Sequence, residues 1–492
     1  MKKRYFIAII PIVLAACTDW LDIQPALEIR KNTMFENEDG FKNVLTGAYI
    51  QMAAPTLYGK NMTMTLPEFM THHWIAATNT LGDHLGRLDH EQTACKDLEA
   101  DIWLAYYQTI VNLNTLLGEI DDKRDLFTNG NYELIKGEAI GLRAFLHFEI
   151  ARLWGDVPAE IKPESPAVPY VKTVTKDPNA LRSISHGEFA RLLLADLDTA
   201  ELLLANDPIT TCFNSILNMP GVVEGYEDYN RPADAYHYYR QSRFNYYAVK
   251  ATKARYYHWI GDRAAAARFA GEVIDAVNIE DGSPKFRLGE ESAAMLGRLT
   301  FPSEHILAVH NSRASEVVTP LFIQSATAYT QDSTLLKTAY ESREHPNDIR
   351  FRNNRLWQTR AVQTGVAATF SYFRKYVVND RDVIDVIPLI RLSEMYFIAI
   401  ENGEHDRFPA YRIARNLDNS LDATITDAGV TEEIILERLE KEYRKEFYGE
   451  GQMFFFYKRH GRDRFTWPST YTINVANYKL PLPETQSTFE IL

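Results

Sequence analysis

The feature that most constrains the fold is a series of helical segments joined in pairs by short turns. In the clearest segment, 132–154, apolar residues recur at spacings of four, four and three, as on one stripe of a helix. These residues are Leu142, Leu146, Ile150 and Leu153. A neighbouring stripe holds small residues that let a second helix pack closely, namely Gly137, Gly141, Ala144 and Ala151. Gly155 and Pro158 then end the helix, because glycine turns the chain and proline cannot continue it.

Similar helices are predicted along most of the chain. They span 37–52, 98–120, 188–204, 241–260, 264–277, 388–401, 409–417 and 431–448. Ser185 and Glu188 form a capping box, and Gly261-Asp262 is a short hinge between two helices. This repetition predicts a mainly α fold, a tetratricopeptide-like scaffold of helical hairpins. The expected scaffold covers approximately 37–57, 98–158, 185–206, 241–278 and 388–461.

Two of these helices carry charged residues with predicted structural roles. Segment 431–448 is expected to bury one apolar stripe, made of Ile435, Leu439, Tyr443 and Phe447. Its other face is expected to be solvated and to carry two i,i+4 ion pairs, Glu437–Lys441 and Glu440–Arg444. Arg391 and Glu394, spaced i,i+3 in segment 388–401, are expected to form a structural ion pair.

Three long insertions separate the hairpins, at approximately 59–97, 211–239 and 281–386. They are rich in Gly, Pro, Asn, Asp, Thr and aromatic residues, so we expect loops with short strands, the better strands being 306–310 and 370–378. The period is therefore irregular, and no tetratricopeptide consensus is intact. Because elaborate loops on a rigid scaffold commonly form binding surfaces, we expect the insertions to face a ligand.

The N-terminus has the layout of a bacterial lipoprotein signal peptide. Lys2, Lys3 and Arg4 precede a ten-residue apolar stretch, which is too short to cross a hydrocarbon core about 30 Å thick. The sequence Leu-Ala-Ala-Cys at 14–17 resembles a lipobox. We therefore expect residues 1–16 to be removed and Cys17 to carry the lipid, with 17–492 as a single domain. The alternative is an ordinary secretory signal followed by a coincidental cysteine.

The net charge limits the classes of partner, and the cysteine content limits the possible disulfides. The chain has a net charge of −13, and removal of three cationic residues with the signal peptide makes it −16. Nucleic acid and anionic lipid surfaces require clustered basic residues, so neither is expected as the main partner. After Cys17 only Cys95 and Cys212 remain, and whether they pair is left open.

A search for catalytic motifs finds none that is specific. The densest polar stretch holds His72-His73-Trp74, Asp83-His84 and Asp89-His90-Glu91. Its residue types are metal ligands, but the HExxH spacing is missing, so we interpret it as a polar surface loop without metal. No GxSxG or GxxxxGK[ST] motif occurs. A pair of carboxylates suited to glycoside hydrolysis stays an open alternative.

Several separated motifs together resemble the SusD/RagB family of outer-membrane nutrient-binding lipoproteins of Bacteroidetes. In chain order they lie at 17–25 (CTDWLDIQP), 137–158, 388–396 (PLIRLSEMY), 443–461 and 480–484 (LPLPE). The chain departs from the family pattern at Glu442-Tyr443, where Glu-Arg is usual, and at Gly449, where an aromatic residue is usual. These departures affect the assignment to a subfamily and not the expected fold.

The resemblance implies a cell-surface lipoprotein of the outer membrane that acts without catalysis and without a cofactor. Such a protein binds an oligosaccharide and delivers it to a partner SusC-like TonB-dependent transporter. The alternatives are a peptide-binding member of the same family and a secreted glycan hydrolase. Nucleic acid is not an expected partner, and the lipid at Cys17 is the expected membrane contact.

Six aromatic residues of the insertions are candidate ligand contacts, because the apolar face of a sugar stacks on an aromatic ring. They are Trp74 in the first insertion, Tyr226, Tyr229 and Tyr236 in the second, and Trp357 and Tyr372 in the third. The alternative for each is a packing role.

Overall fold

A computed structural model describes residues 33–220, 224–225, 227–232, 234–323, 328–361, 369–378, 383–417 and 430–491. The signal peptide, Cys17 and Tyr226 lie outside the described residues. The predictions of signal cleavage and lipidation therefore stay predictions.

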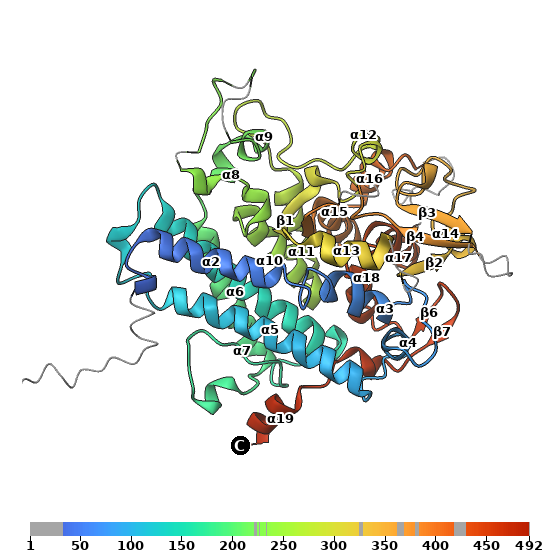
Figure 1. Cartoon of the computed structure of the whole chain (residues 1–492), viewed down its shortest axis with the longest axis horizontal. Helices are drawn as coiled ribbons and strands as arrows, with labels where there is room; N and C mark the ends of the chain where they lie inside the picture. Colours follow the sequence, from blue (N-terminus) through green and yellow to red (C-terminus); the bar gives the residue numbers. More distant parts are fainter. Residues whose placement is uncertain are drawn as a thin grey trace, which may run out of the picture.

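The described scaffold contains ten helices, the nine that the sequence pattern predicts and one more, α18, and the chain is mainly α (Figure 1). They are α2 (Glu38–Met52), α5 (Thr93–Leu117), α6 (Asn131–Trp154), α7 (His186–Leu203), α10 (Tyr246–Ile260), α11 (Arg263–Ile274), α15 (Leu392–Glu401), α16 (Phe408–Ala414), α17 (Glu432–Glu446) and α18 (Gln452–Arg459). Neighbours pack as hairpins, α5 on α6, α6 on α7, and α10 on α11. The predicted caps are present, since Ser185 Oγ accepts a hydrogen bond from Glu188 N and Gly261 adopts a left-handed φ of 80°.

Helix α6 shows why small residues matter in this scaffold. Its predicted apolar stripe is fully buried. A Cβ added at Gly137 would lie 2.7 Å from Cγ of Leu204, at the end of α7. A Cβ added at Gly141 would overlap the ring of Phe244, just before α10. The two glycines therefore allow α7 and the start of α10 to lie directly on α6.

Three small antiparallel sheets accompany the helices. The first pairs β1 (His305–His310) with β5 (Val386–Arg391), the second has the order β2 (Thr330–Asp332), β4 (Thr369–Phe373), β3 (Trp357–Ala361), and the third pairs β6 (Arg464–Phe465) with β7 (Tyr471–Thr472). The predicted strands at 306–310 and 370–378 are confirmed, the second over a shorter range. The predicted helix 388–401 is wrong over its first four residues, which belong to β5. That run is apolar and buried, so its pattern fits a core strand as well as a helix.

Arg391 and Glu394 do not form the predicted ion pair. Arg391, at the end of β5, binds three buried carboxylates instead: Glu304 at 2.9 Å, Glu446 at 2.7 Å and Glu450 at 2.9 Å. Glu394 binds Arg255 of α10 at 2.6 Å. The error follows from the strand, because only a helix would place positions i and i+3 side by side.

The apolar stripe of α17 is buried as predicted, but its charged face is solvated only in part. Glu437 is 69% exposed and lies 3.8 Å from Lys441. Arg444, which pairs with Glu440 at 3.1 Å, is only 7% exposed. The last turns of α17 enter the core, where burial would raise the pKa of Glu442 but Lys445 and Arg350 lower it to about 2. The solvated-face prediction is therefore wrong for this half of the helix.

The insertions contain more helix than expected. The first holds a π-helical turn, Asn61–Thr65, followed by α3 (Leu66–Met70) and α4 (Leu81–Gly86). The second holds α9 (Asn214–Leu217) and follows directly on α8 (Pro208–Thr211). The third holds α12 (Glu291–Met295), α13 (Ala314–Val318) and α14 (Ser333–Ala339). A last helix, α19 (Glu484–Ile491), ends the described chain. The loop prediction is wrong for α3, where apolar residues are buried against α18.

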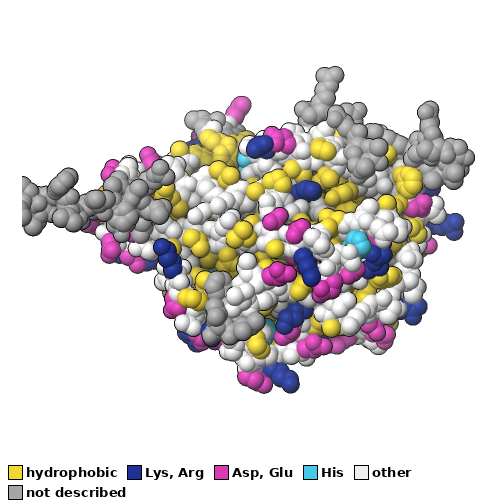
Figure 2. Space-filling view, turned by 60° about the horizontal axis from the view of Figure 1, so that its bottom comes forward, with side chains coloured by type: hydrophobic (Ala, Val, Ile, Leu, Met, Phe, Trp, Pro, Cys, Tyr) yellow, Lys and Arg dark blue, Asp and Glu magenta, His cyan; other side chains and the backbone are white. Residues whose placement is uncertain are grey.

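Among the described residues, no helix has the length and apolar character that crossing a membrane requires. On the face in Figure 2, acidic and basic side chains are interspersed with hydrophobic ones. Cys95 and Cys212 are both buried free thiols, which answers the open question of their pairing. Burial raises the pKa of Cys95 to about 12, so this thiol is unreactive near neutral pH.

Candidate functional site

The first and third insertions meet at one end of the molecule, which we call the insertion end. Ile75 N donates a hydrogen bond to Thr330 O over 2.9 Å. Gln331 Nε2 donates to the carbonyl oxygens of His72 and His73 over 3.2 and 3.1 Å. The hairpin β6–β7 lies beside them, at the right of Figure 1 together with α3, α4 and α14. The insertion end therefore joins three segments that are far apart in the sequence.

The second insertion lies elsewhere, against the start of α6. His237 Nε2 and Asn131 Oδ1 are 2.7 Å apart, and Asn131 Nδ2 donates to Asp234 over 2.8 Å. It also contacts the start of the third insertion, where Lys285 Nζ donates to Cys212 O over 2.9 Å.

A pocket of about 350 Å³ opens at the insertion end. We call it the Tyr471 pocket. Its main lining residues are Phe69, His72, Ile75, Gly82, Asp83, Arg87, Asp332, Leu335, Pro468 and Tyr471, with Trp74 beneath them. This volume lies in the range of small-ligand sites, and the mixture of apolar surface with a few polar groups is typical of such sites.

The wall formed by α4 depends on two glycines one turn apart. A Cβ at Gly82 would lie 2.5 Å from the ring of Phe69, and one at Gly86 would lie 3.2 Å from Cε1 of His72. Thr80 caps the helix by accepting from Asp83 N. The glycines therefore bring α4 directly onto α3 and the turn that follows it, which places Asp83 and Arg87 at the pocket.

Tyr471 provides a half-buried aromatic ring at the pocket. It pairs with Phe465 across the β6–β7 hairpin, and its ring centroid is 4.8 Å from that of His72. Burial raises the pKa of Tyr471, so its hydroxyl stays protonated and can both donate and accept a hydrogen bond. Burial lowers the pKa of His72, which is therefore neutral at pH 7.

The backbone of His72 is held in an uncommon conformation. Its φ is 57°, in the left-handed region that few residues other than glycine adopt. His72 N donates to Phe69 O, and the amide of Gln331 holds the two carbonyls that follow the turn. Local strain of this kind occurs where surrounding structure fixes the backbone, often at ligand sites.

The polar groups of the pocket are fixed acceptors and donors. Asp83 Oδ2 accepts from Arg87 Nη1 and from Asn79 N, both over 2.8 Å. Asp332 Oδ1 accepts from the backbone N–H groups of Thr334 and Leu335 and so caps α14. N–H donors therefore hold one oxygen of each carboxylate in a fixed position. This arrangement suits recognition of hydroxyl groups beside an apolar surface.

Trp74 and Trp357 are brought together, but in the core. Each is 2% exposed, and their ring centroids are 6.1 Å apart in a cluster with Phe373 and Tyr448. Trp74 Nε1 donates to Met64 O over 2.8 Å. Both rings therefore pack in this aromatic cluster, and Trp74 also forms the base of the Tyr471 pocket.

The predicted tyrosines are dispersed. Tyr372 is half-buried on β4, and Tyr229 is half-buried with its ring 5.6 Å from that of Phe213. The ring of Tyr236 lies 4.3 Å from the guanidinium of Arg243, whose Nη1 donates to the Tyr236 hydroxyl. None of these three lines the Tyr471 pocket. Ligand contact by these tyrosines stays a prediction.

Sequence reasoning missed Tyr471, Asp332 and Leu335. A local pattern existed for the first, because Phe465, Trp467 and Tyr471 surround a Pro-Ser-Thr turn just beyond the last scaffold helix. For Asp332 and Leu335 no local pattern was available, since their role depends on the pairing of the third insertion with the first.

The polar stretch of the first insertion is not a surface loop throughout. His73 is buried and its Nδ1 lies 2.7 Å from Glu68 Oε2, while buried His90 lies 2.6 Å from Glu99. Glu68 also accepts from the N–H groups of Gly449 and Gly451, which ties the insertion to the scaffold. The surface-loop interpretation is therefore wrong for these histidines. No group of three or more potential metal ligands occurs in the part of the chain that the structure describes.

Comparison with known proteins supports the family resemblance. Residues 19–216 match the model of a SusD-like family described as "Starch-binding associating with outer membrane". No curated protein matches the chain significantly.

Solved structures share the fold over nearly the whole chain. A SusD superfamily protein from Bacteroides thetaiotaomicron is 18% identical, with a TM-score of 0.68 over 92% of this chain and 98% of its own. A SusD superfamily protein from Bacteroides vulgatus gives 18% identity and a TM-score of 0.67 over 93% and 98%. A SusD-like carbohydrate binding protein from the same species gives 15% and 0.67 over 93% and 97%. At these identities the match establishes the fold, and it agrees with the predicted helical scaffold.

Proposed function

We propose that this chain is a SusD-like protein and that it binds an oligosaccharide at the Tyr471 pocket without transforming it. The observation that carries the proposal is the combination of a half-buried tyrosine that lines the pocket with fixed polar groups. The ring of Tyr471 offers an apolar face for a pyranose, and Asp83, Arg87 and Asp332 can accept from or donate to its hydroxyls.

The family description and a relative's carbohydrate binding support a saccharide as the ligand. A peptide-binding site would instead depend on backbone donors and acceptors in extended geometry. The pocket groups are side chains around an aromatic ring, which favours the sugar over the peptide. A hydrolase would use one of the pocket carboxylates, Asp83 or Asp332, as its general acid, and the incubation experiment below tests this alternative.

We further propose that the protein is tethered to the outer face of the outer membrane by a lipid on Cys17. From there it would deliver its ligand to a SusC-like TonB-dependent transporter. The lipobox-like sequence supports the anchor, and the family resemblance supports the transporter. A Cys17→Ala protein should lose its membrane association on cell fractionation, while normal surface attachment of that variant would contradict the anchor.

Isothermal titration of the purified protein against a panel of oligosaccharides and peptides tests the ligand class. We expect binding of at least one oligosaccharide and none of the peptides. Binding of peptides alone would overturn the sugar assignment. Chromatography of each saccharide after prolonged incubation should show it unchanged, whereas shortened products would establish hydrolysis.

A further inference from the structure

A second and larger pocket lies beside the Tyr471 pocket. It has a volume of about 940 Å³ and is lined by α14, the turn at 341–345, α17 and residues Thr466 and Trp467. Asp332 and Leu335 line the Tyr471 pocket, whereas Thr334, Lys337 and Thr338 line the larger one. Likewise, Trp467 lines the larger pocket and Pro468 lines the Tyr471 pocket. Helix α14 and the 466–468 segment therefore form a common wall.

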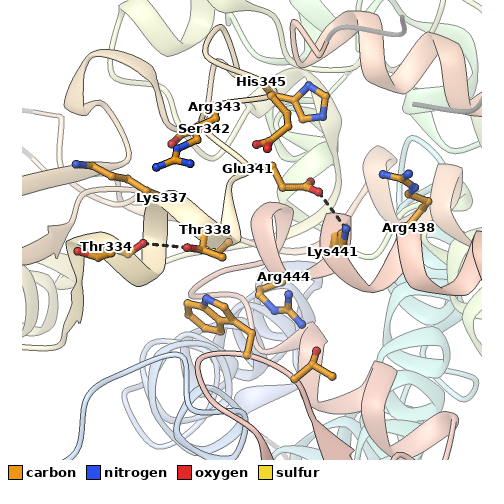
Figure 3. A pocket seen from close by; sticks show the side chains of 14 residues that line it. Thr334, Lys337, Thr338, Glu341, Ser342, Arg343, His345, Arg438, Lys441 and Arg444 are labelled. Atoms are coloured by element: carbon orange, nitrogen blue, oxygen red, sulfur yellow. Dashed lines mark hydrogen bonds and ion pairs between the residues drawn. The ribbon is translucent and has the colours of Figure 1, made fainter. Parts of the chain in front are cut away.

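The charge of this pocket is opposite to that of the chain. Five cationic side chains line it: Lys337, Arg343, Arg438, Lys441 and Arg444. Only two carboxylates do so, those of Glu341 and Glu344, although the whole chain carries a net charge of −13. We call it the basic pocket. The cations come from two sides, Lys337 and Arg343 from α14 and its following turn, the others from α17 (Figure 3).

One of the two carboxylates is already neutralised. Glu341 accepts from Lys441 Nζ over 3.0 Å and from Lys445 Nζ over 2.6 Å. Burial would raise the pKa of Glu341, but the two lysines hold it below its ordinary value, so the carboxylate is ionised and paired. Glu341 therefore positions Lys441 and does not cancel the other cations.

Two of the cationic side chains, those of Lys337 and Arg343, are available to a ligand. Across the described parts of the chain, the side chains of Lys337 and Arg343 make neither an ion pair nor a hydrogen bond, and both are exposed. By contrast, Arg444 binds Glu440 and lies 5.5 Å from the ring of Trp467. Unpaired cations in a concave site focus the field on an anion that enters it.

From these observations we propose that the basic pocket binds the acidic group of an anionic oligosaccharide, a carboxylate or a sulfate carried by one sugar unit. The neighbouring unit would occupy the Tyr471 pocket across the common wall. The inference rests on the proposed function, since it takes the ligand to be a saccharide. Hydroxyl groups of Thr334, Thr338, Ser342 and Thr466 and the ring of Trp467 also line the pocket, and these suit a sugar better than an acidic peptide.

The test compares a Lys337→Ala/Arg343→Ala double variant with wild type. Titration calorimetry would use three probes: neutral maltotriose, trigalacturonate as the carboxylate-bearing sugar, and a sulfated carrageenan tetrasaccharide. We expect the wild type to bind one acidic probe more tightly than the neutral one, and the double variant to lose at least fivefold in affinity for it alone. The acidic probe that binds identifies the anion.

A matched control removes the same charge elsewhere. Lys96 and Arg268 are exposed and lie outside both pockets, in pairs with Glu91 and Glu272. A Lys96→Ala/Arg268→Ala variant should bind the acidic probe as the wild type does. Raising the salt concentration should weaken acidic binding in the wild type and in this control, because salt screens the attraction.

Three results would overturn the inference, and they separate it from the proposed function. If both double variants lost the same affinity for the acidic probe, the loss would come from the change in net charge and not from the basic pocket. Binding of neutral but not acidic saccharides would leave the proposed function standing without an anion subsite. If acidic peptides bind and no saccharide does, both proposals fail.

Discussion

Arginine side chains have opposite surroundings in the scaffold core and at the insertion end. In the core, Arg391 and Arg415 are at most 1% exposed, and both bind Glu304 and Glu446. At the insertion end, Arg343 is exposed in the basic pocket and has no such partner among the described residues. The first arrangement satisfies every charge internally and so stabilises one fold. The second leaves a cationic side chain available to bind an anionic ligand.

The same contrast holds for aromatic residues. Trp74 and Trp357 are each 2% exposed, while Tyr471 keeps part of its ring exposed. The comparison teaches that residue type alone does not identify a binding group in this molecule. Its position at a pocket, with part of the side chain exposed there, separates a candidate binding group from a packing residue. Changes in the core should therefore alter stability, and changes at the insertion end should alter ligand binding.

The largest expected effect is on the core. Glu446→Ala would leave Arg391 and Arg415 each without one buried carboxylate. Breaking a buried ion pair in this way costs about 3–5 kcal/mol of unfolding free energy. Urea denaturation followed by circular dichroism would measure it, with Glu437→Ala on the exposed face of the same helix as the control. Equal stability of the two variants would contradict the role given to the buried network.

The next largest effect is expected at α4, which packs on Phe69 and also lines the Tyr471 pocket. Gly82→Ala would place a Cβ 2.5 Å from the ring of Phe69, so α4 would have to shift. Overpacking of this kind costs about 1–3 kcal/mol. Because α4 carries Asp83 and Arg87, the same variant should weaken saccharide binding. Gly47→Ala is the matched control, since a Cβ there meets nothing within 4 Å. If Gly82→Ala were as benign as this control, α4 would not depend on the close approach.

A smaller effect is expected from pH. His147 Nδ1 donates to Arg143 O and its Nε2 accepts from Val171 N, an arrangement that only the neutral ring can make. Burial lowers the pKa of His147 from 6.5 to about 3. The unfolded chain therefore binds a proton below pH 6.5 that the folded chain does not, and stability falls as the pH drops from 6.5 toward 3.

At pH 5.5 this one group should cost about 1 kcal/mol relative to neutral pH, because the unfolded chain is then one pH unit below the ordinary pKa of histidine. Denaturation curves at pH 7 and 5.5 would measure the change, which His147→Gln should reduce. His310→Gln, at an exposed position, should leave it as in the wild type. A pH response that is the same in all three proteins would remove His147 as its source.

Much of the scaffold could be predicted from sequence because its determinants are local. The apolar spacing of α6, the Ser185 cap and the Gly261 turn are each encoded within a short stretch of sequence. The start of α15 could not be fixed, because a short buried run at 386–391 fits strand and helix equally. Pairing of β5 with β1, from 80 residues earlier, decides it.

The site was less predictable because distant contacts build it. The insertions were correctly identified as different in composition, but their aromatic residues supply a core of their own, so Trp74 and Trp357 are buried. Tyr471 becomes a pocket residue only because its hairpin lies beside His72. The basic pocket likewise requires α14 and α17 to face each other, which no local pattern encodes.

The central claim is that the Tyr471 pocket holds a saccharide. The most direct measurement is titration calorimetry of Tyr471→Ala with the oligosaccharide that the wild type binds best. We expect affinity to fall at least tenfold, about 1.4 kcal/mol, because the stacking face is removed. Tyr257→Ala, which removes a half-buried ring from scaffold helix α10, should bind within twofold of wild type. Unchanged affinity in Tyr471→Ala, with the fold intact, would contradict the account.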